Sequence, residues 1–327
     1  MPGPVPLVRT VRSGVVESIH LGSVVVADAD GRVLAAVGDP DRLTFTRSCA
    51  KPIQAAVSAS ATTTPLPDDL LALSCGSHTG ETAHVAGVRR ILRRAGLGVA
   101  ALACPPDRPS RGADAKAVRR ASPVFHNCSG KHAAMLLACV DAGWDPATYV
   151  APRHPLQRRV LDAIRRASDA EPTIGVDGCG VPVHAIPLRS VATAFARLSA
   201  PQRLGSLAAP VARATAAMVA HPFLVAGTGR SDTALMTAVP GLVTKVGAEG
   251  LHAATFLGTG IGVAVRIEDG ADRAAAPALL EALVLAGLVD RAASERADLA
   301  PIARRAVLGG GRAVGEIRAG FALRRAR

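Results

Sequence analysis

The chain has 327 residues, 49% of them hydrophobic, and a formal net charge of +12, so it is long enough to bury a substantial core. The charge invites a nucleic-acid interpretation, but the arginines are scattered and aromatic residues make up only 2%, which argues against a specific nucleic-acid partner. No apolar run reaches the roughly 18 to 20 residues of a membrane helix, and the N-terminus has no apolar signal core, so we expect a cytoplasmic protein without a membrane partner.

Strand patterns occur at both ends of the chain, and helical patterns lie between them. Near the start, apolar runs at 23–27 and 32–37 flank an Asp30-Gly31 turn, which is the signal of a hairpin. Apolar residues then recur at helical spacing in four segments, 79–95, 130–142, 155–168 and 203–220. The last part of the chain predicts strands at 241–246 and 260–267, a helix over 276–289 and a final strand near 312–319.

This order of elements predicts an α+β fold, with one antiparallel sheet built from both chain ends and a helical middle. We expect a single unit over residues 1–327. Its sheet lobe comprises roughly 1–47 and 222–327, and its mainly helical lobe comprises 48–221.

Only four of the 38 basic residues are lysines, and Lys51, Lys131 and Lys245 lie in short polar motifs. A lysine amine can lose its proton when it is desolvated, whereas a guanidinium effectively cannot. Lysines retained in an arginine-rich chain are therefore candidates for an amine that titrates. Chance placement is the alternative, and the local contexts argue against it.

Ser48-x-x-Lys51 places a hydroxyl and an amine on one face of a helix, where a neutral amine could take the serine proton. Pro52 is tolerated only in a first turn, so we expect Ser48 at or just before the helix start, near free backbone donors. An N-cap serine beside a solvated lysine is the alternative.

Two later motifs extend this pattern. Ser77 and His78 lie in a small polar cluster, for which a plain helix start capped by Ser77 or Thr79 is the alternative. Lys245-Val-Gly247 lies on an apolar strand, where a lysine is costly unless it faces a polar cavity. Penicillin-binding proteins and class A β-lactamases combine Ser-x-x-Lys, a second serine and Lys-Thr-Gly in this order.

Cysteines mark a second constellation. Cys128 begins the segment that runs to Gly143, with Asn127 or Ser129 as the expected cap, and a helix N-terminus favours a thiolate. Cys179 lies in a Gly-Cys-Gly loop after Asp177. Two thiolates with the neutral amine of Lys131 could hold zinc, although lysine is a rare ligand and common metal-site spacings are absent.

At these motifs the chain resembles the Rhizobium-type (inducible, thermolabile) L-asparaginase II family. The resemblance spans nearly the whole chain, and its most specific block is Asn127 to His132. The segments that carry it are Gly14 to His20, Arg47 to Pro52, Ser77-His78, Asn127 to His132, Asp177 to Cys179, His221-Pro222, Ala226 to Thr233, Lys245 to Gly247, Ile267 to Gly270 and Gly320 to Arg324.

The resemblance implies a fold like that of serine β-lactamases and penicillin-binding proteins, a homodimer, and hydrolysis of L-asparagine to aspartate and ammonia. It implies two Ser-Lys tandems, Ser48 with Lys51 and Ser77 with Lys245. Zinc would be bound by Cys128, Lys131 and Cys179 and would aid substrate binding without driving the chemical step. Residues implied to line the substrate pocket are Arg47, His78, Asn127, Lys131 and Asp177. Cys49 and Thr228 depart from the family pattern, where we expect alanine and an acidic residue.

The resulting hypothesis is an amidohydrolase in which Ser48, activated by neutral Lys51, attacks the side-chain amide carbon of L-asparagine. Ser77 and Lys245 would relay protons and assist the departure of ammonia. The sequence does not decide which serine is the nucleophile. Two other classes stay open: a β-lactamase-like or peptide-directed Ser-x-x-Lys hydrolase, and a non-catalytic sensor of zinc or an amino acid.

Overall fold

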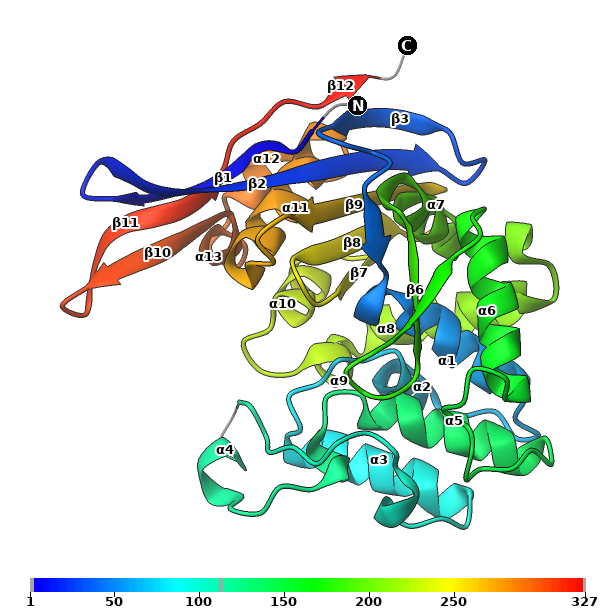
Figure 1. Cartoon of the computed structure of the whole chain (residues 1–327). Coiled ribbons are helices and arrows are strands. Elements are labelled where there is room, and N and C mark those ends of the chain that lie inside the picture. The colour runs from blue at the N-terminus through cyan, green and yellow to red at the C-terminus, as the bar shows by residue number, and fades with distance from the viewer. Residues whose placement is uncertain (1–2, 112–113, 326–327) are drawn as a thin grey trace.

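A computed structural model describes residues 3–111 and 114–325, and it contains a sheet lobe above a helical lobe (Figure 1). Within the described residues the main sheet is antiparallel throughout, with the order β10-β11-β1-β2-β9-β8-β7; β3 pairs with β2, and β12 with β3. Its strands are β1 (Val5–Arg12), β2 (Val15–Asp28), β3 (Val33–Val37), β7 (Leu242–Val246), β8 (Leu251–Phe256), β9 (Ile261–Ile267), β10 (Arg304–Gly309), β11 (Arg312–Ala319) and β12 (Arg324–Arg325).

Helices cover both faces of this sheet. Along β2, Val25 joins the core shared with the helical lobe, whereas Val24 and Val26 join the core under α11, as the two-residue period of a strand requires. α7 (Leu188–Ser199) packs on one face, and α10 (Ser231–Ala238) and α11 (Asp272–Leu285) pack on the other. The short helices α12 (Arg291–Ser294) and α13 (Ala300–Ala303) lie beside α11.

The helical lobe is built mainly on alanine and leucine, and α5 is buried along most of its length. The helices of this part are α1 (Lys51–Ser60), α2 (Asp68–Ser74), α3 (Thr82–Arg94), α4 (Asp114–Ala117), α5 (Ser129–Asp141), α6 (Pro155–Ser168), α8 (Ala208–Ala220) and α9 (Pro222–Ala226). A small antiparallel sheet in the order β4-β6-β5 comprises β4 (Leu43–Phe45), β5 (Thr173–Val176) and β6 (Pro182–Pro187).

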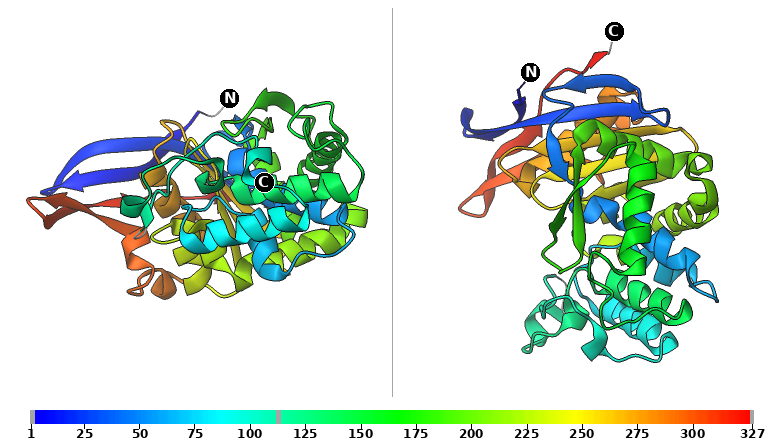
Figure 2. Two further views of the ribbon diagram at one scale, coloured as in Figure 1. Left: turned by 90° about the horizontal axis from the view of Figure 1, so that it is seen from below. Right: turned by 45° about the vertical axis from the view of Figure 1, so that its right-hand side comes forward.

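The β1–β2 and β10–β11 hairpins reach beyond the helices on one side of the molecule in both further views (Figure 2). Strands from the two chain ends therefore lie side by side, with Arg9 of β1 opposite Arg318 of β11. Among the helices of the described ranges, none combines the length and apolarity needed to cross a bilayer.

The α+β layout predicted from the sequence is confirmed: both chain ends supply the main sheet, and helices fill most of the middle. Two helices differ from their expected extents. The helix expected over 276–289 runs from Asp272, whose carboxylate suits a first turn, to Leu285, after which Gly287 has φ +70°. The segment 203–220 is not one helix, because Gly205 breaks it into a 3-10 stretch and α8.

Candidate active site

Lys51 and Ser77 meet between α1 and the loop that precedes α3. The Lys51 side chain is only 1% exposed, and its Nζ lies 2.8 Å from Ser77 Oγ. The same Nζ donates to the Gly76 carbonyl at 2.6 Å and to the Asn127 carbonyl at 3.4 Å. A hydroxyl and a buried amine are therefore in direct contact, held by backbone carbonyls from two other segments.

Ser77 is available for this contact because it is not a helix cap. α3 is capped by Glu81, which forms a capping box with His84, so neither Ser77 nor Thr79 takes the alternative role considered from the sequence. The Ser77 amide donates to the Val225 carbonyl at 2.8 Å, which fixes the backbone of the serine against α9.

Ser48 lies where Pro52 required it, in a 3-10 turn (Arg47–Ala50) that runs directly into α1. The turn is attached to β7 through Cys49, whose thiol donates to the Lys245 carbonyl at 3.0 Å. Ser48 is partly exposed, and within the described residues its hydroxyl makes no hydrogen bond. The hydroxyl that contacts Lys51 is thus that of Ser77.

Burial is the main reason why the pKa of Lys51 is lowered to about 8, because charging an amine in a dry site is costly. A nearby Cys128 thiolate opposes this shift, whereas Lys131 and Lys245 add to it as like charges. The pKa of Lys51 therefore moves toward neutral pH, as a general base requires.

Lys245 lies on β7 and pairs with an acid instead of a serine. Its Nζ is 3.3 Å from Asp232 Oδ2, and both side chains are 0% exposed. Asp232 also accepts from His252 Nε2 at 2.8 Å and from the Val246 amide at 2.9 Å. Despite its burial, the pKa of Asp232 is lowered by Lys245, His252 and the Val246 amide. Lys245 is held as one half of a buried ion pair.

Asp232 and His252 were not assigned a role from the sequence. Asp232 lies in the quoted Ala226 to Thr233 block, and Lys245 offered a usable signal, because a lysine inside an apolar strand requires an acid partner. His252 has no comparable signal. It is paired with Val246 across β7 and β8, so its contact with Asp232 depends on strand register.

Cys128, Lys131 and Cys179 form a second buried cluster at the N-terminus of α5. Lys131 Nζ lies 3.0 Å from Cys179 Sγ, and all three side chains are at most 4% exposed. Cys128 occupies the N-cap position, so neither Asn127 nor Ser129 caps the helix as expected. Asn127 instead accepts a hydrogen bond from Cys128 Sγ at 3.0 Å.

The two thiols differ in acidity. A hydrogen bond from Cys179 keeps the pKa of Cys128 well below its usual value, and Lys51 and Lys131 add to this effect. The same hydrogen bond, together with burial, raises the pKa of Cys179. Burial alone would lower the pKa of Lys131, but the two sulfur atoms reverse that and raise it. The cluster thus favours one thiolate beside an ammonium.

This donor set suits zinc only with the help of the lysine. Within the described residues no group of three or more His, Cys, Asp or Glu side chains could hold a metal. Two thiolates and a deprotonated Lys131 would supply two sulfur donors and one nitrogen donor and leave a fourth tetrahedral position open. Lys131 would have to release its proton on binding, as metal ligands do.

The residues expected to line the substrate pocket are arranged in two ways. Arg47 and Asp177 form an ion pair of 2.7 Å, with 27% and 11% of their side chains exposed. Arg47 has φ +43°, an unusual conformation for a residue with a Cβ. His78 is buried, and both ring nitrogens are engaged, by the Gly80 amide and by Ser129 Oγ. Its pKa is lowered by burial.

Thr228, one of the two departures from the family pattern, contacts a carboxylate. Its amide and hydroxyl donate to the two oxygens of Glu81 at 2.9 and 2.8 Å. An acidic side chain at 228 would face Glu81 with like charge. A threonine at position 228 is therefore suited to Glu81, because it donates hydrogen bonds to that carboxylate and carries no charge.

A model of the family described as L-asparaginase II matches residues 8–319 of the chain. Among solved structures, the chain is similar to the protein called Mglu, with 13% identity and a TM-score of 0.48 over 82% of this chain and 68% of that one. It is also similar to a β-lactamase from Mycobacterium bovis, with 15% identity and a TM-score of 0.44 over 82% and 95%. No curated protein matches the sequence.

Proposed function

Because the chain belongs to the L-asparaginase II family, we propose that it hydrolyses L-asparagine to L-aspartate and ammonia through a serine acyl-enzyme. Family membership gives the broad class, an asparaginase-type hydrolase. The observation that carries the finer proposal is the 2.8 Å contact between the buried Lys51 amine and the Ser77 hydroxyl.

In the first step, neutral Lys51 takes the proton of Ser77, and Oγ attacks the side-chain amide carbon of the substrate. The tetrahedral intermediate collapses as the C–N bond breaks, and the proton on Lys51 passes to the leaving nitrogen to give ammonia. Water then attacks the aspartyl ester, gives a proton through Lys51 back to Ser77 and releases aspartate. Ser48 is the competing nucleophile.

Lys245 has an electrostatic role in this scheme. Its ammonium is fixed by Asp232 and lies near enough to lower the pKa of Lys51. The fixed positive charge therefore favours the neutral form of the base. This role replaces the direct proton relay with Ser77 that was expected from the sequence.

The Arg47–Asp177 ion pair offers complementary groups for the two charges of an amino acid. On binding, the Arg47 guanidinium would pair with the α-carboxylate of the substrate, and the Asp177 carboxylate would pair with its α-amine. The ion pair between the two side chains would thus be replaced by two ion pairs with the substrate. An arginine with φ +43° paired with a nearly buried acid supports this proposal.

The pH dependence follows from the lowered pKa of Lys51. Only the neutral amine can accept a proton, so kcat/KM is expected to rise with pH and to level off above about 8. A pH profile measured with L-asparagine checks this. Lys51→Arg removes the titrating base and should abolish the rising limb together with the activity. A limb that falls through pH 8 would contradict the assignment.

The activity itself is tested by ammonia release from L-asparagine with the purified full chain. Nitrocefin and L-asparagine are assayed in parallel, and calorimetry measures asparagine binding. Ammonia release without nitrocefin turnover supports the proposal. Nitrocefin turnover alone indicates a β-lactamase-like hydrolase, and tight asparagine binding without turnover indicates a sensor.

We also propose that Cys128, Lys131 and Cys179 bind zinc, and that the metal there would aid substrate binding. Metal analysis after loading and desalting should find zinc in the wild type and lose it in Cys128→Ser and Cys179→Ser. Cys139→Ala, on the same helix but outside the cluster, is the matched control. Equal zinc content in all four proteins would exclude this site. The homodimer implied by the resemblance stays a prediction.

A further inference from the structure

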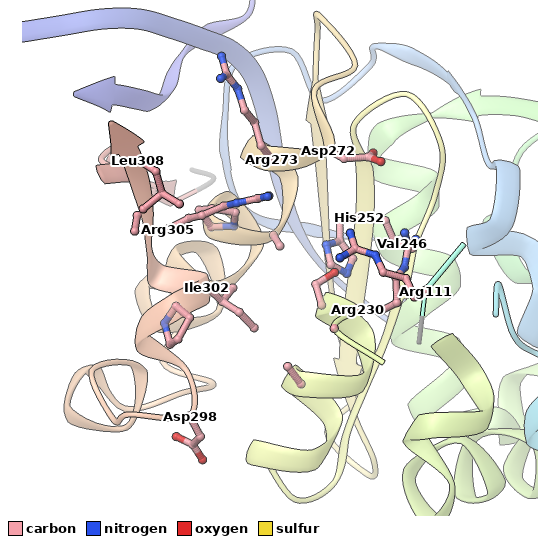
Figure 3. A pocket seen from close by; sticks show the side chains of 17 residues that line it. Arg111, Arg230, Val246, His252, Asp272, Arg273, Asp298, Ile302, Arg305 and Leu308 are labelled. Carbon is pink, nitrogen blue, oxygen red and sulfur yellow. The ribbon is translucent and has the colours of Figure 1, made fainter. Parts of the chain in front are cut away.

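A cleft of about 660 Å³ lies between α10, α11 and β10, and Val246 of β7 and His252 of β8 form part of its lining. Neither serine and none of the catalytic lysines lines it. Figure 3 shows Arg230, His252 and Arg111 on one side, and Arg305, Ile302 and Leu308 on the other. Its volume is within the roughly 300 to 1,000 Å³ typical of small-molecule sites.

The cleft is rich in arginines that have no acidic partner. Within the described ranges, Arg111, Arg230 and Arg305 make no side-chain hydrogen bond or ion pair. The fourth arginine, Arg273, donates to His20 and Ser18. Two acids also line the cleft, Asp272 and Asp298, but Asp298 is already paired with Arg296, outside the cleft, at 2.7 Å. The free charge in the cleft is therefore positive.

A buried histidine supplies a second, independent observation. His252 is 0% exposed, its Nε2 is committed to Asp232, and in the described part of the chain its Nδ1 has no hydrogen-bond partner. A buried polar atom without a partner is costly, so such atoms often mark a place for a ligand or water. In the neutral ring that donates Nε2–H to Asp232, Nδ1 is an acceptor, so it is left for a hydroxyl of an occupant or for a water beside it.

We propose that this cleft binds a small organic dianion, such as a dicarboxylate, as a second ligand site distinct from the Ser77 site. The guanidinium groups of Arg230, which precedes α10, and of Arg305 on β10 are suited to bind oxyanions from two sides, since arginine pairs with carboxylate or phosphate through parallel hydrogen bonds. Pro277, Ile302 and Leu308 give the cleft an apolar part that fits a carbon chain. Beneath it, His252 and Asp232 connect the cleft to Lys245.

The test is calorimetry of the full chain at low ionic strength, with succinate and with inorganic phosphate as probes. The double variant Arg230→Gln/Arg305→Gln should bind the probes at least about tenfold more weakly, because two charge-assisted hydrogen-bond donors are lost. Arg153→Gln/Arg158→Gln removes the same charge from exposed sites in the helical lobe and should leave affinity unchanged. Circular dichroism establishes that each variant is folded.

Arg47→Ala separates the cleft from the Ser77 site. Binding that survives Arg47→Ala and is lost in the cleft variant supports the proposal. Binding lost in Arg47→Ala but kept in the cleft variant would assign the probe to the Ser77 site and overturn it. Equal losses in the cleft and control doubles, or no binding of either probe by the wild type, would overturn it as well.

Discussion

Ser77→Ala is expected to lower kcat/KM for L-asparagine by roughly 10³-fold or more, because it removes the hydroxyl that contacts the buried base. Ser48 is the comparison, since it is the serine of the Ser-x-x-Lys motif, but its hydroxyl makes no hydrogen bond within the described residues. Ser48→Ala should therefore cost less than Ser77→Ala. Initial rates of ammonia release, with stability checked by thermal unfolding, measure both.

A matched control for these serines is Ser58, which lies on α1 and donates to the Gln54 carbonyl within its own helix. Ser58→Ala should keep near-normal turnover. If Ser48→Ala abolished ammonia release while Ser77→Ala retained it, the roles of the two serines would be exchanged. Full activity in both variants would end the serine mechanism.

Asp232→Ala is expected to destabilise the fold by about 3 to 5 kcal/mol, because it leaves the ammonium of Lys245 buried without its counter-charge. The loss should appear in the free energy of unfolding measured with urea. Activity should fall too in whatever fraction stays folded. Without Asp232 the Lys245 side chain is no longer held near Lys51, where its charge lowers the pKa of that base.

Two further variants make this prediction specific. Asp162→Ala removes an acid from an exposed ion pair with Arg165 and should change stability by less than about 0.5 kcal/mol. Asp232→Leu combined with Lys245→Met removes both buried charges and should recover most of the lost stability, because apolar residues can replace a buried pair. An Asp232→Ala protein as stable as wild type would contradict the ion pair.

Local patterns were sufficient to predict the layout of the fold, with strands at both chain ends and helices between them. Apolar runs around the Asp30-Gly31 turn predicted the hairpin of β2 and β3, and helical spacing predicted α5 and α6. β4, β5 and β6 were not predicted, since each is short and β6 is almost fully buried, without alternation. α7, in which ten of twelve residues are buried, was not predicted either.

For the candidate site, too, local features were predictable from the sequence, whereas contacts between distant segments were not. That three lysines would be buried followed from their apolar and polar contexts, and each is at most 2% exposed. Which serine meets Lys51 did not follow, because Lys51 is close to Ser48 in sequence but to Ser77 only after α2 folds back on α1. Lys245 indicates that an acid partner exists, but its identity as Asp232 depends on the same long-range packing, and His252 has no local signal at all.

Trapping of the acyl-enzyme tests the central claim most directly. The full chain is mixed with L-asparagine, quenched in acid at steady state, digested and examined by peptide mass spectrometry. The account predicts an aspartyl group attached to Ser77. An aspartyl group on Ser48 alone, or turnover with no acylated serine in any peptide, would contradict it.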